Sequence, residues 1–223
     1  MKARVAVVLV LAAGVLVAGS AAAAAPSCRI VKDRTGDTYA VSPQNAPPAG
    51  SPVHGPQDDY LDLVNADLAS DGKNLTAVVR VRKLARTSTT SPLATTYALT
   101  FSVPGRPGSA TLRAQLHSKG AAYEALTTSA ADVSTYLGPA LGAIDFQKNE
   151  VRMTVPVSVF KSYAAIKRGT KLKPVETTTG RGTSAPALAT PGAPAPSRGL
   201  DADIATGGKT YAVGARSCLR VGG

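Results

Sequence analysis

The stretch that decides the fold is residues 60–84, YLDLVNADLASDGKNLTAVVRVRKL. At its centre, residues 70–73 (SDGK) carry the Asp-Gly pair that favours a tight hairpin turn. From Leu75 to Val81 every second residue is apolar, and most of the residues between them are polar. A period of two is typical of a strand with one buried face, so the stretch predicts an antiparallel hairpin.

Other strand-like segments follow this hairpin or precede it, separated by turn-forming residues. They cover residues 28–32, 96–103, 110–117, 122–126, 151–157, 170–178 and 209–219. Residues 158–166 have the pattern of one short helix or 3-10 turn. Short strands in this number predict an all-β fold, an antiparallel β-sandwich of the immunoglobulin or jelly-roll kind.

The N-terminal segment has the pattern of an export signal. Lys2 and Arg4 precede an apolar run, and small residues follow it. We therefore expect residues 1–25 to be a cleaved signal peptide of a secreted bacterial protein. The alternative is an uncleaved anchor, because the charge-free stretch is long enough to cross a bilayer. After cleavage we expect no membrane span.

The rest of the chain divides by composition. Residues 26–179 are predicted to form the sandwich domain. Residues 180–199 are rich in Pro, Ala and Gly and have no apolar period, which predicts a mobile loop. Residues 200–223 are expected to return to the domain as a C-terminal strand. In an exported protein Cys28 and Cys218 are expected to form a disulfide, the alternative being two free thiols.

The composition argues against catalysis. Two cysteines, two histidines and no tryptophan leave little for zinc or triad chemistry. The sequence contains no nucleophile elbow, no zinc-protease motif and no phosphate-binding glycine loop. We expect no enzymatic activity. The alternative is a hydrolase that uses His54 or His117 in a dispersed Ser-His-Asp site.

Five aspartates flank one long loop near the expected mature N-terminus: Asp33, Asp37, Asp58, Asp59 and Asp62. Carboxylate oxygens that converge from such a loop suit Ca²⁺, which takes six to eight oxygen ligands. The pattern predicts a calcium site. The alternative is that these residues only form turns and caps.

Basic residues dominate the chain, whose net charge is +11. Arg80, Arg82, Lys83 and Arg86 lie close together at the end of the hairpin and predict a patch for an anionic partner, such as a cell-wall polymer or polysaccharide. The alternative is an ordinary solvated face. Nucleic acid is not expected as a partner, because aromatic residues do not interleave with these charges.

Four motifs occur in a recognisable order: DRTGD at residues 33–37, the Asp-rich hairpin DDYLDLVNADLASDGKNLTAVVRV at 58–81, TYALTFSV at 96–103 and VRMTVPVS at 151–158. Over residues 30–178 this order resembles the DOMON and family-9 carbohydrate-binding-module sandwich domains of secreted bacterial proteins. The resemblance implies a β-sandwich, and similar sugar-binding domains can carry structural calcium. Without a tryptophan for a sugar platform or a Met/His haem pair, it implies no particular ligand.

The sequence therefore predicts a secreted, non-enzymatic binding or structural module of the cell envelope or extracellular space. Two alternatives are a calcium-stabilised carbohydrate- or cell-wall-binding module and a hydrolase with a dispersed site.

Overall fold

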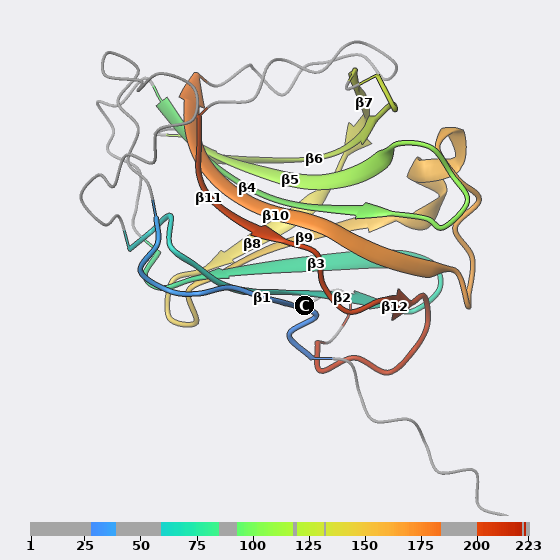
Figure 1. The fold of residues 1–223 in the computed structure, drawn as a ribbon, viewed down its shortest axis with the longest axis horizontal. Coiled ribbons are helices and arrows are strands. Elements are labelled where there is room, and N and C mark those ends of the chain that lie inside the picture. The colour runs from blue at the N-terminus through green and yellow to red at the C-terminus, as the bar shows by residue number, and fades with distance from the viewer. Residues whose placement is uncertain are drawn as a thin grey trace, which may run out of the picture.

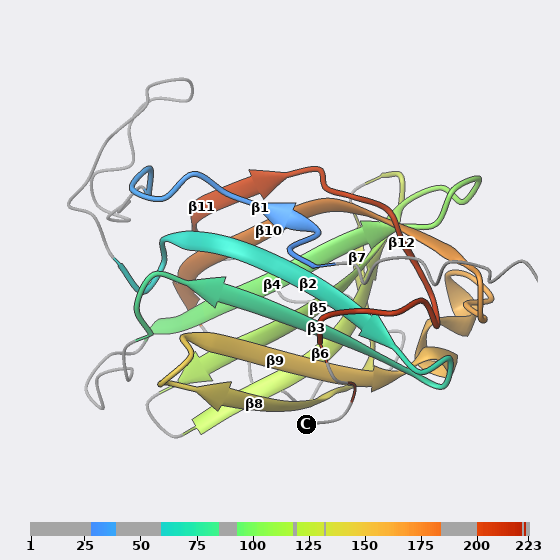
Figure 2. The same ribbon diagram turned by 90° about the horizontal axis from the view of Figure 1, so that it is seen from below.

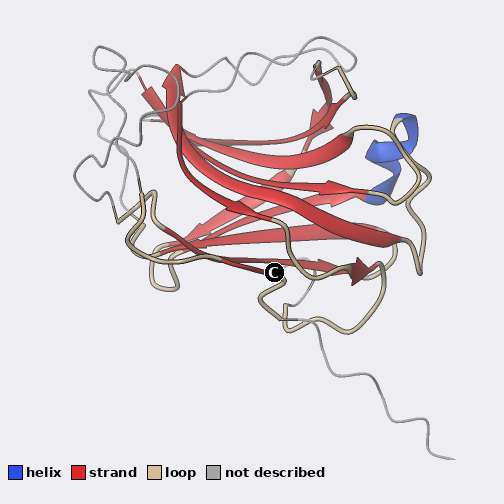
Figure 3. Ribbon diagram, viewed as in Figure 1, coloured by secondary structure: helices blue, strands red, loops and turns tan. Residues whose placement is uncertain are grey.

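Two antiparallel sheets pack face to face (Figure 1), which confirms the predicted all-β sandwich. The computed structural model describes residues 28–38, 59–84, 93–117, 120–131, 133–183, 200–219 and 221. Within these residues, strands make up nearly all of the regular structure, and one 3-10 helix is present (Figure 3). The predicted signal peptide lies outside the described residues.

The first sheet is built on the predicted hairpin. Its order is β1 (Val31–Lys32), β2 (Leu63–Ser70), β3 (Asn74–Val81), β9 (Glu150–Pro156) and β8 (Leu141–Asp145). The hairpin turn is held by Asp71, whose Oδ1 accepts hydrogen bonds from the backbone N–H groups of Lys73 and Asn74. Gly72 takes the left-handed conformation that this turn needs, with a φ of 92°. The predicted hairpin is therefore confirmed.

The second sheet has the order β11 (Leu200–Thr206), β10 (Lys171–Thr183), β4 (Leu93–Ser102), β5 (Ser109–His117), β6 (Gly120–Thr128) and β7 (Ser134–Pro139). The short strand β12 (Tyr211–Ala212) also pairs with β10. Every pairing in this sheet is antiparallel, and a short connection, residues 103–108, joins β4 to β5, as the breaker residues there indicated.

The alternating apolar residues of the two sheets meet in one core. In β3 the inward residues are the predicted ones, from Leu75 to Val81, and all are buried. Facing them, Phe101 of β4 packs edge to face against Phe160, with ring centroids 5.5 Å apart. Phe160 belongs to the 3-10 helix η2 (Val157–Ser162), which confirms the predicted short helix or 3-10 turn near 158–166. It begins directly after Pro156 ends β9.

The outer face of the first sheet is partly covered by the two terminal segments (Figure 2). Cys28 and Cys218 form the predicted disulfide, with their Cα atoms 5.2 Å apart. Beside it, Ser217 Oγ donates a 3.0 Å hydrogen bond to the carbonyl of Leu68 in β2. Consequently the outward residue Val78 of β3 is fully buried, although it points away from the core.

Several predicted boundaries are wrong. Strands β7 and β8 were not predicted, because their residues alternate weakly: three of the five residues of β8 are exposed. Residues 180–183 belong to β10 rather than to the predicted loop, since Gly180 pairs with Thr96. The predicted strand at 209–219 is replaced by β11 and the two-residue β12.

We expect the disulfide to contribute strongly to stability, because it closes a loop over a sequence separation of 190 residues. Replacing both cysteines by serine should lower the free energy of unfolding by up to about 5 kcal/mol. Urea unfolding measures this loss. Reductant should shift the wild-type curve towards that of the variant and leave the variant itself unchanged, whereas equal midpoints for both proteins would contradict the expectation.

Candidate metal site

The β1 edge of the first sheet and the β11 edge of the second sheet lie against each other, and we call this contact the seam. The backbone N–H of Lys209, just after β11, donates to the carbonyl of Ile30 at 2.7 Å. The backbone N–H of Leu63, at the start of β2, donates to Oδ2 of Asp203 in β11 at 2.7 Å. The N-terminal and C-terminal parts of the described chain are therefore bonded directly to each other at this edge.

Three carboxylates gather at the seam. Asp33 follows β1, Asp37 follows the turn after it, and Asp203 lies on the inner face of β11. One carboxylate oxygen from each of these residues lies within 4.8 Å of the other two. Asp203 is only 4 % exposed, and the other two are half-buried. Oxygen atoms at this spacing could hold a divalent cation between them.

The turn DRTGD positions the first two carboxylates. Gly36 has a φ of 90°, a backbone conformation that favours glycine, and this reverses the chain before Asp37. Its N–H donates to both carboxylate oxygens of Asp62 at 3.0 Å, which ties the turn to the start of β2. Asp62 thus anchors the loop and lies outside the group of three.

Unsatisfied polar atoms are concentrated around this group. Five buried side-chain oxygen or nitrogen atoms in the described part of the chain have no hydrogen-bond partner. Two of them are Oδ2 of Asp33 and Oδ1 of Asp37, and a third is Oγ1 of Thr38, the next residue. A fourth is Oγ1 of Thr177 in β10, which pairs with Ala205 of β11, two residues along the strand from Asp203.

Buried polar atoms normally have partners, so unpaired oxygens on two of the three carboxylates and on the adjacent Thr38 call for an explanation. Carboxylate and hydroxyl oxygens can ligate a cation, whereas a guanidinium nitrogen only donates hydrogen bonds. The fifth unpaired atom, Nη2 of Arg113, is a donor on the second sheet, and its side chain is paired with Glu124 through Nε at 2.6 Å. The seam is thus the place in the described chain where unpaired oxygens gather.

The pKa values of two of the three carboxylates, Asp33 and Asp203, are raised above the ordinary value of an aspartate. Burial, together with the nearby charges of Asp33 and Asp37, raises the pKa of Asp203 to about 7, although the hydrogen bond from the N–H of Leu63 acts in the opposite direction. Burial also raises the pKa of Asp33, which shares a hydrogen bond with Asp203. Without a cation, Asp203 therefore keeps its proton in mildly acidic solution and loses it as the pH rises through about 7.

The five predicted calcium ligands are only partly brought together. Asp33 and Asp37 join the group, whereas Asp59 forms an ion pair with Arg82 at 3.4 Å and Asp62 lies 3.7 Å from the same guanidinium. Asp58 lies outside the described residues. Asp203 was missed, because it is far from the others in sequence and the expected C-terminal strand gave no indication that it would lie beside the DRTGD turn.

The predicted anionic-partner patch consists mainly of ion pairs. Arg80 lies 2.6 Å from both Asp67 and Glu150, and Arg82 is paired as described above. The backbone N–H of Lys83 donates to the carbonyl of Asp59. Arg86 lies outside the described residues, as does His54, while His117 ends β5.

Comparison with known family models, curated proteins and solved structures found no match. The resemblance to DOMON and family-9 carbohydrate-binding-module domains therefore stays a prediction at the level of motifs. In the described part of the chain, no helix has the length and apolar character needed to cross a membrane.

The raised pKa of Asp203 predicts how stability depends on pH in the absence of metal. Between about pH 4 and pH 7 the folded state keeps this proton, whereas the unfolded chain has lost it. The unfolded state then binds fewer protons, so the free energy of unfolding falls as pH rises through this window and levels off above it. Urea midpoints in EDTA at pH 5, 6, 7 and 8 measure the slope.

The matched variant is Asp203→Asn, which cannot ionise and should flatten this slope. Asp59→Asn, an exposed aspartate outside the group, should leave the slope as it is in the wild type. A wild-type midpoint that rises from pH 5 to pH 8, or equal slopes in wild type and Asp203→Asn, would contradict the assignment.

Proposed function

We propose that this chain is a secreted, non-enzymatic binding or structural module of the cell envelope or extracellular space, and that its fold is closed by Ca²⁺ held at Asp33, Asp37 and Asp203. The observation that carries the cation is the cluster of buried oxygens without partners at the seam. The three carboxylates supply oxygen ligands only, the donor type that Ca²⁺ prefers.

Electrostatics favour a cation over the bare cluster. Three carboxylates within 4.8 Å repel one another, and burial removes much of the water that would screen them. A divalent cation replaces this repulsion by attraction. It would also join the two sheets, because Asp33 and Asp37 come from the β1 side and Asp203 from β11.

Export is supported by two independent features. The N-terminal sequence has the pattern of a signal peptide, and the disulfide joins two segments at opposite ends of the described chain. Structural disulfides persist in oxidising compartments and are rare in the cytosol. Fractionation of cells that produce the full chain, followed by thiol titration under denaturing conditions, tests this part. Cytoplasmic retention with two free thiols would contradict it.

The proposed cation predicts a calcium-dependent stability. In the mature protein at pH 8, millimolar Ca²⁺ should raise the Tm by several degrees and EDTA should reverse the rise, because a ligand that binds only the folded state stabilises it. At pH 5.5 the rise should be smaller, since protons compete for the same carboxylates. Differential scanning calorimetry gives both values.

The Asp203→Asn variant distinguishes calcium binding at this site from a general effect of ionic strength on the Tm. This variant should lose most of the calcium response, yet in EDTA at pH 8 it should be at least as stable as the wild type, because one repelling charge is removed. Asp59→Asn should respond to Ca²⁺ like the wild type. The cation site would be refuted if neither Ca²⁺ nor EDTA changed the Tm of the wild type, or if Ca²⁺ raised the Tm of Asp203→Asn as much as that of the wild type.

A further inference from the structure

Positive charge gathers at one end of the sandwich, the end that carries the 3-10 helix η2 (Figure 3). Three stretches of the chain meet there: the connection between β4 and β5, the residues from η2 to the start of β10, and the residues from the end of β11 onwards. These stretches, residues 103–108, 157–175 and 205–219, contain eight Lys or Arg residues and no Asp or Glu. All eight are exposed, and we call them the basic end: Arg106, Lys161, Lys167, Arg168, Lys171, Lys173, Lys209 and Arg216.

The three stretches are held side by side by strand pairing and by hydrogen bonds. Strand β12, in the last stretch, pairs with the first two residues of β10. Ser102 at the end of β4 pairs with Lys173, which places the connection to β5 beside the start of β10. The hydroxyl of Tyr163, just after η2, donates a 3.1 Å hydrogen bond to the carbonyl of Gly108 in that connection. The eight cations therefore belong to one surface.

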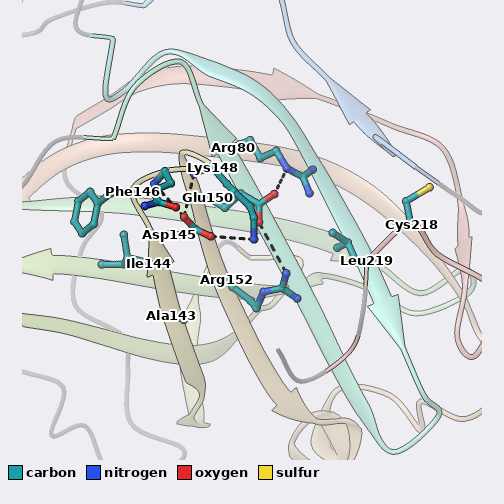
Figure 4. Close-up of a pocket in the computed structure, with 11 residues that line it drawn as sticks. Arg80, Ala143, Ile144, Asp145, Phe146, Lys148, Glu150, Arg152, Cys218 and Leu219 are labelled. Atoms are coloured by element: carbon teal, nitrogen blue, oxygen red, sulfur yellow. Dashed lines mark hydrogen bonds and ion pairs between the residues drawn. The ribbon is translucent and has the colours of Figure 1, made fainter.

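These cations have no carboxylate partners in the described part of the chain. None of the eight takes part in an ion pair with a described residue. The groove of about 710 Å³ on the outer face of the first sheet shows the opposite arrangement (Figure 4). There Arg80 and Arg152 pair with Glu150 at 2.6 and 3.9 Å, and Lys148 pairs with Asp145 at 3.1 Å. The cations of the groove are thus neutralised from within, whereas the charge of the basic end is uncompensated.

Two acidic residues border the basic end in the described chain, and neither neutralises it. Asp71 lies in the turn between β2 and β3, where Lys73 carries the opposite charge two residues away. Glu176 lies farther along β10 and is a single negative charge. Eight positive charges therefore far outweigh the negative charge at this end.

The carboxylates of the seam lie too far away to neutralise this surface. Asp203 pairs with Thr179, which is eight residues along β10 from Lys171. In an extended strand this separation is about 26 Å. Exposed charges are largely screened beyond about 8 Å at physiological ionic strength. An anion in solution is therefore attracted to the basic end without opposition from the seam.

The arrangement of the cations favours a chain-like anion. Lys171 and Lys173 flank the buried Leu172, so they point to the same side of β10, about 7 Å apart. The other cations are spread over the three stretches. A small anion contacts one or two exposed cations, which is a weak interaction. A linear polymer with repeated charges contacts several of them at once and gains affinity from each.

The uncharged side chains of this surface distinguish between kinds of polyanion. Within the three stretches Val175 is the one large apolar side chain that is exposed, whereas binding to a bilayer surface needs an apolar face. Single-stranded nucleic acid needs exposed aromatic rings for stacking, and Phe160 and Tyr211 are fully buried. A hydrophilic anionic polymer needs neither, so it fits this surface best.

We propose that the basic end binds a linear anionic polysaccharide, whose repeated charges lie along Lys171 and Lys173 and continue onto the neighbouring stretches. The inference rests on the proposed function, because it gives the secreted binding module a class of partner and a surface for it. This surface lies away from Arg80, Arg82 and Lys83, for which the sequence predicted an anionic partner.

Isothermal titration calorimetry with dextran sulfate, on the oxidised mature protein in EDTA, tests the proposal. We expect saturable binding that weakens at least about tenfold when NaCl is raised from about 50 to about 200 mM, because several counterions are released on binding. Neutral dextran, which has the same backbone without the charges, should show no binding. Absence of saturable dextran sulfate binding, or binding that salt does not weaken, would overturn the proposal.

Vesicles that contain phosphatidylglycerol test the bilayer as the alternative partner. At the same salt concentration, co-sedimentation should show weaker binding to these vesicles than to dextran sulfate, because the basic end lacks an apolar face. Tighter binding to the vesicles than to dextran sulfate would overturn the choice of a polysaccharide.

Two double variants of equal charge locate the surface. Lys171→Gln/Lys173→Gln removes two charges from the basic end and should weaken dextran sulfate binding at least about fivefold. Lys83→Gln/Lys148→Gln is the matched control and should weaken it less than about twofold, because these exposed lysines lie where the end of β3 meets the turn between β8 and β9. Equal weakening by the two variants would show that net charge alone governs binding and would overturn the assignment.

The readouts separate this proposal from the proposed function. Because the titration is done in EDTA, it does not depend on the cation site. A calcium-dependent Tm together with no dextran sulfate binding would refute the basic end as a binding surface and leave the cation site standing. If Lys171→Gln/Lys173→Gln does not fold, as judged by circular dichroism, Lys167→Gln/Arg168→Gln in the turn before β10 takes its place with the same expected weakening.

Discussion

The rest of the structure depends on the seam where the first and last parts of the described chain bond to each other. An open sandwich exposes strand edges whose N–H and C=O groups lack partners. Here the edge at β1 and β2 is joined to β11 and the segment after it by the bonds of Lys209 to Ile30 and of Leu63 to Asp203. Closing this edge buries Ala205 and Tyr211 in the core, but it also forces buried carboxylates together.

Closing this edge also determines how buried polar groups are paired on the outer face of the first sheet. Asp67 is 2 % exposed because the N-terminal segment lies against it, and its Oδ1 accepts a hydrogen bond from the N–H of Ile30. Arg80 neutralises the same carboxylate from β3. A buried ion pair gains little net stability, but leaving either partner alone is costly. The pair therefore specifies where the terminal segment is placed more than it stabilises the fold.

The sequence predicted those parts of the fold in which local pattern and tertiary packing agree. The hairpin β2–β3 was predictable because its Asp-Gly turn and its alternation both act over a few residues. Strand β8 was not predictable from its alternation, because an edge strand with little burial has no strong apolar pattern. The disulfide could be inferred from the export signal and the cysteine count, since no other partner was available for either thiol.

The candidate site was only half predictable for the same reason. The motif that contains Asp33 and Asp37 is local, and its turn chemistry is visible in the sequence. Asp203 is brought to it by the contact of β11 with β1 and β2, between segments 140 residues apart in sequence, which no local spacing encodes. Likewise, Asp59 and Asp62 looked equivalent to the other aspartates, and only the tertiary position of Arg82 separates them.

Two clamps act on the terminal segments at different points. The disulfide holds the segment around Cys218 across the outer face of the first sheet, and the proposed cation would hold the loop at Asp33 and Asp37 against β11. One clamp requires an oxidant and the other requires calcium at the concentrations that extracellular modules bind. A reducing, calcium-poor cytoplasm supplies neither. Both clamps would therefore close together only after export, which couples the final closure of the sandwich to the compartment in which we propose that it works.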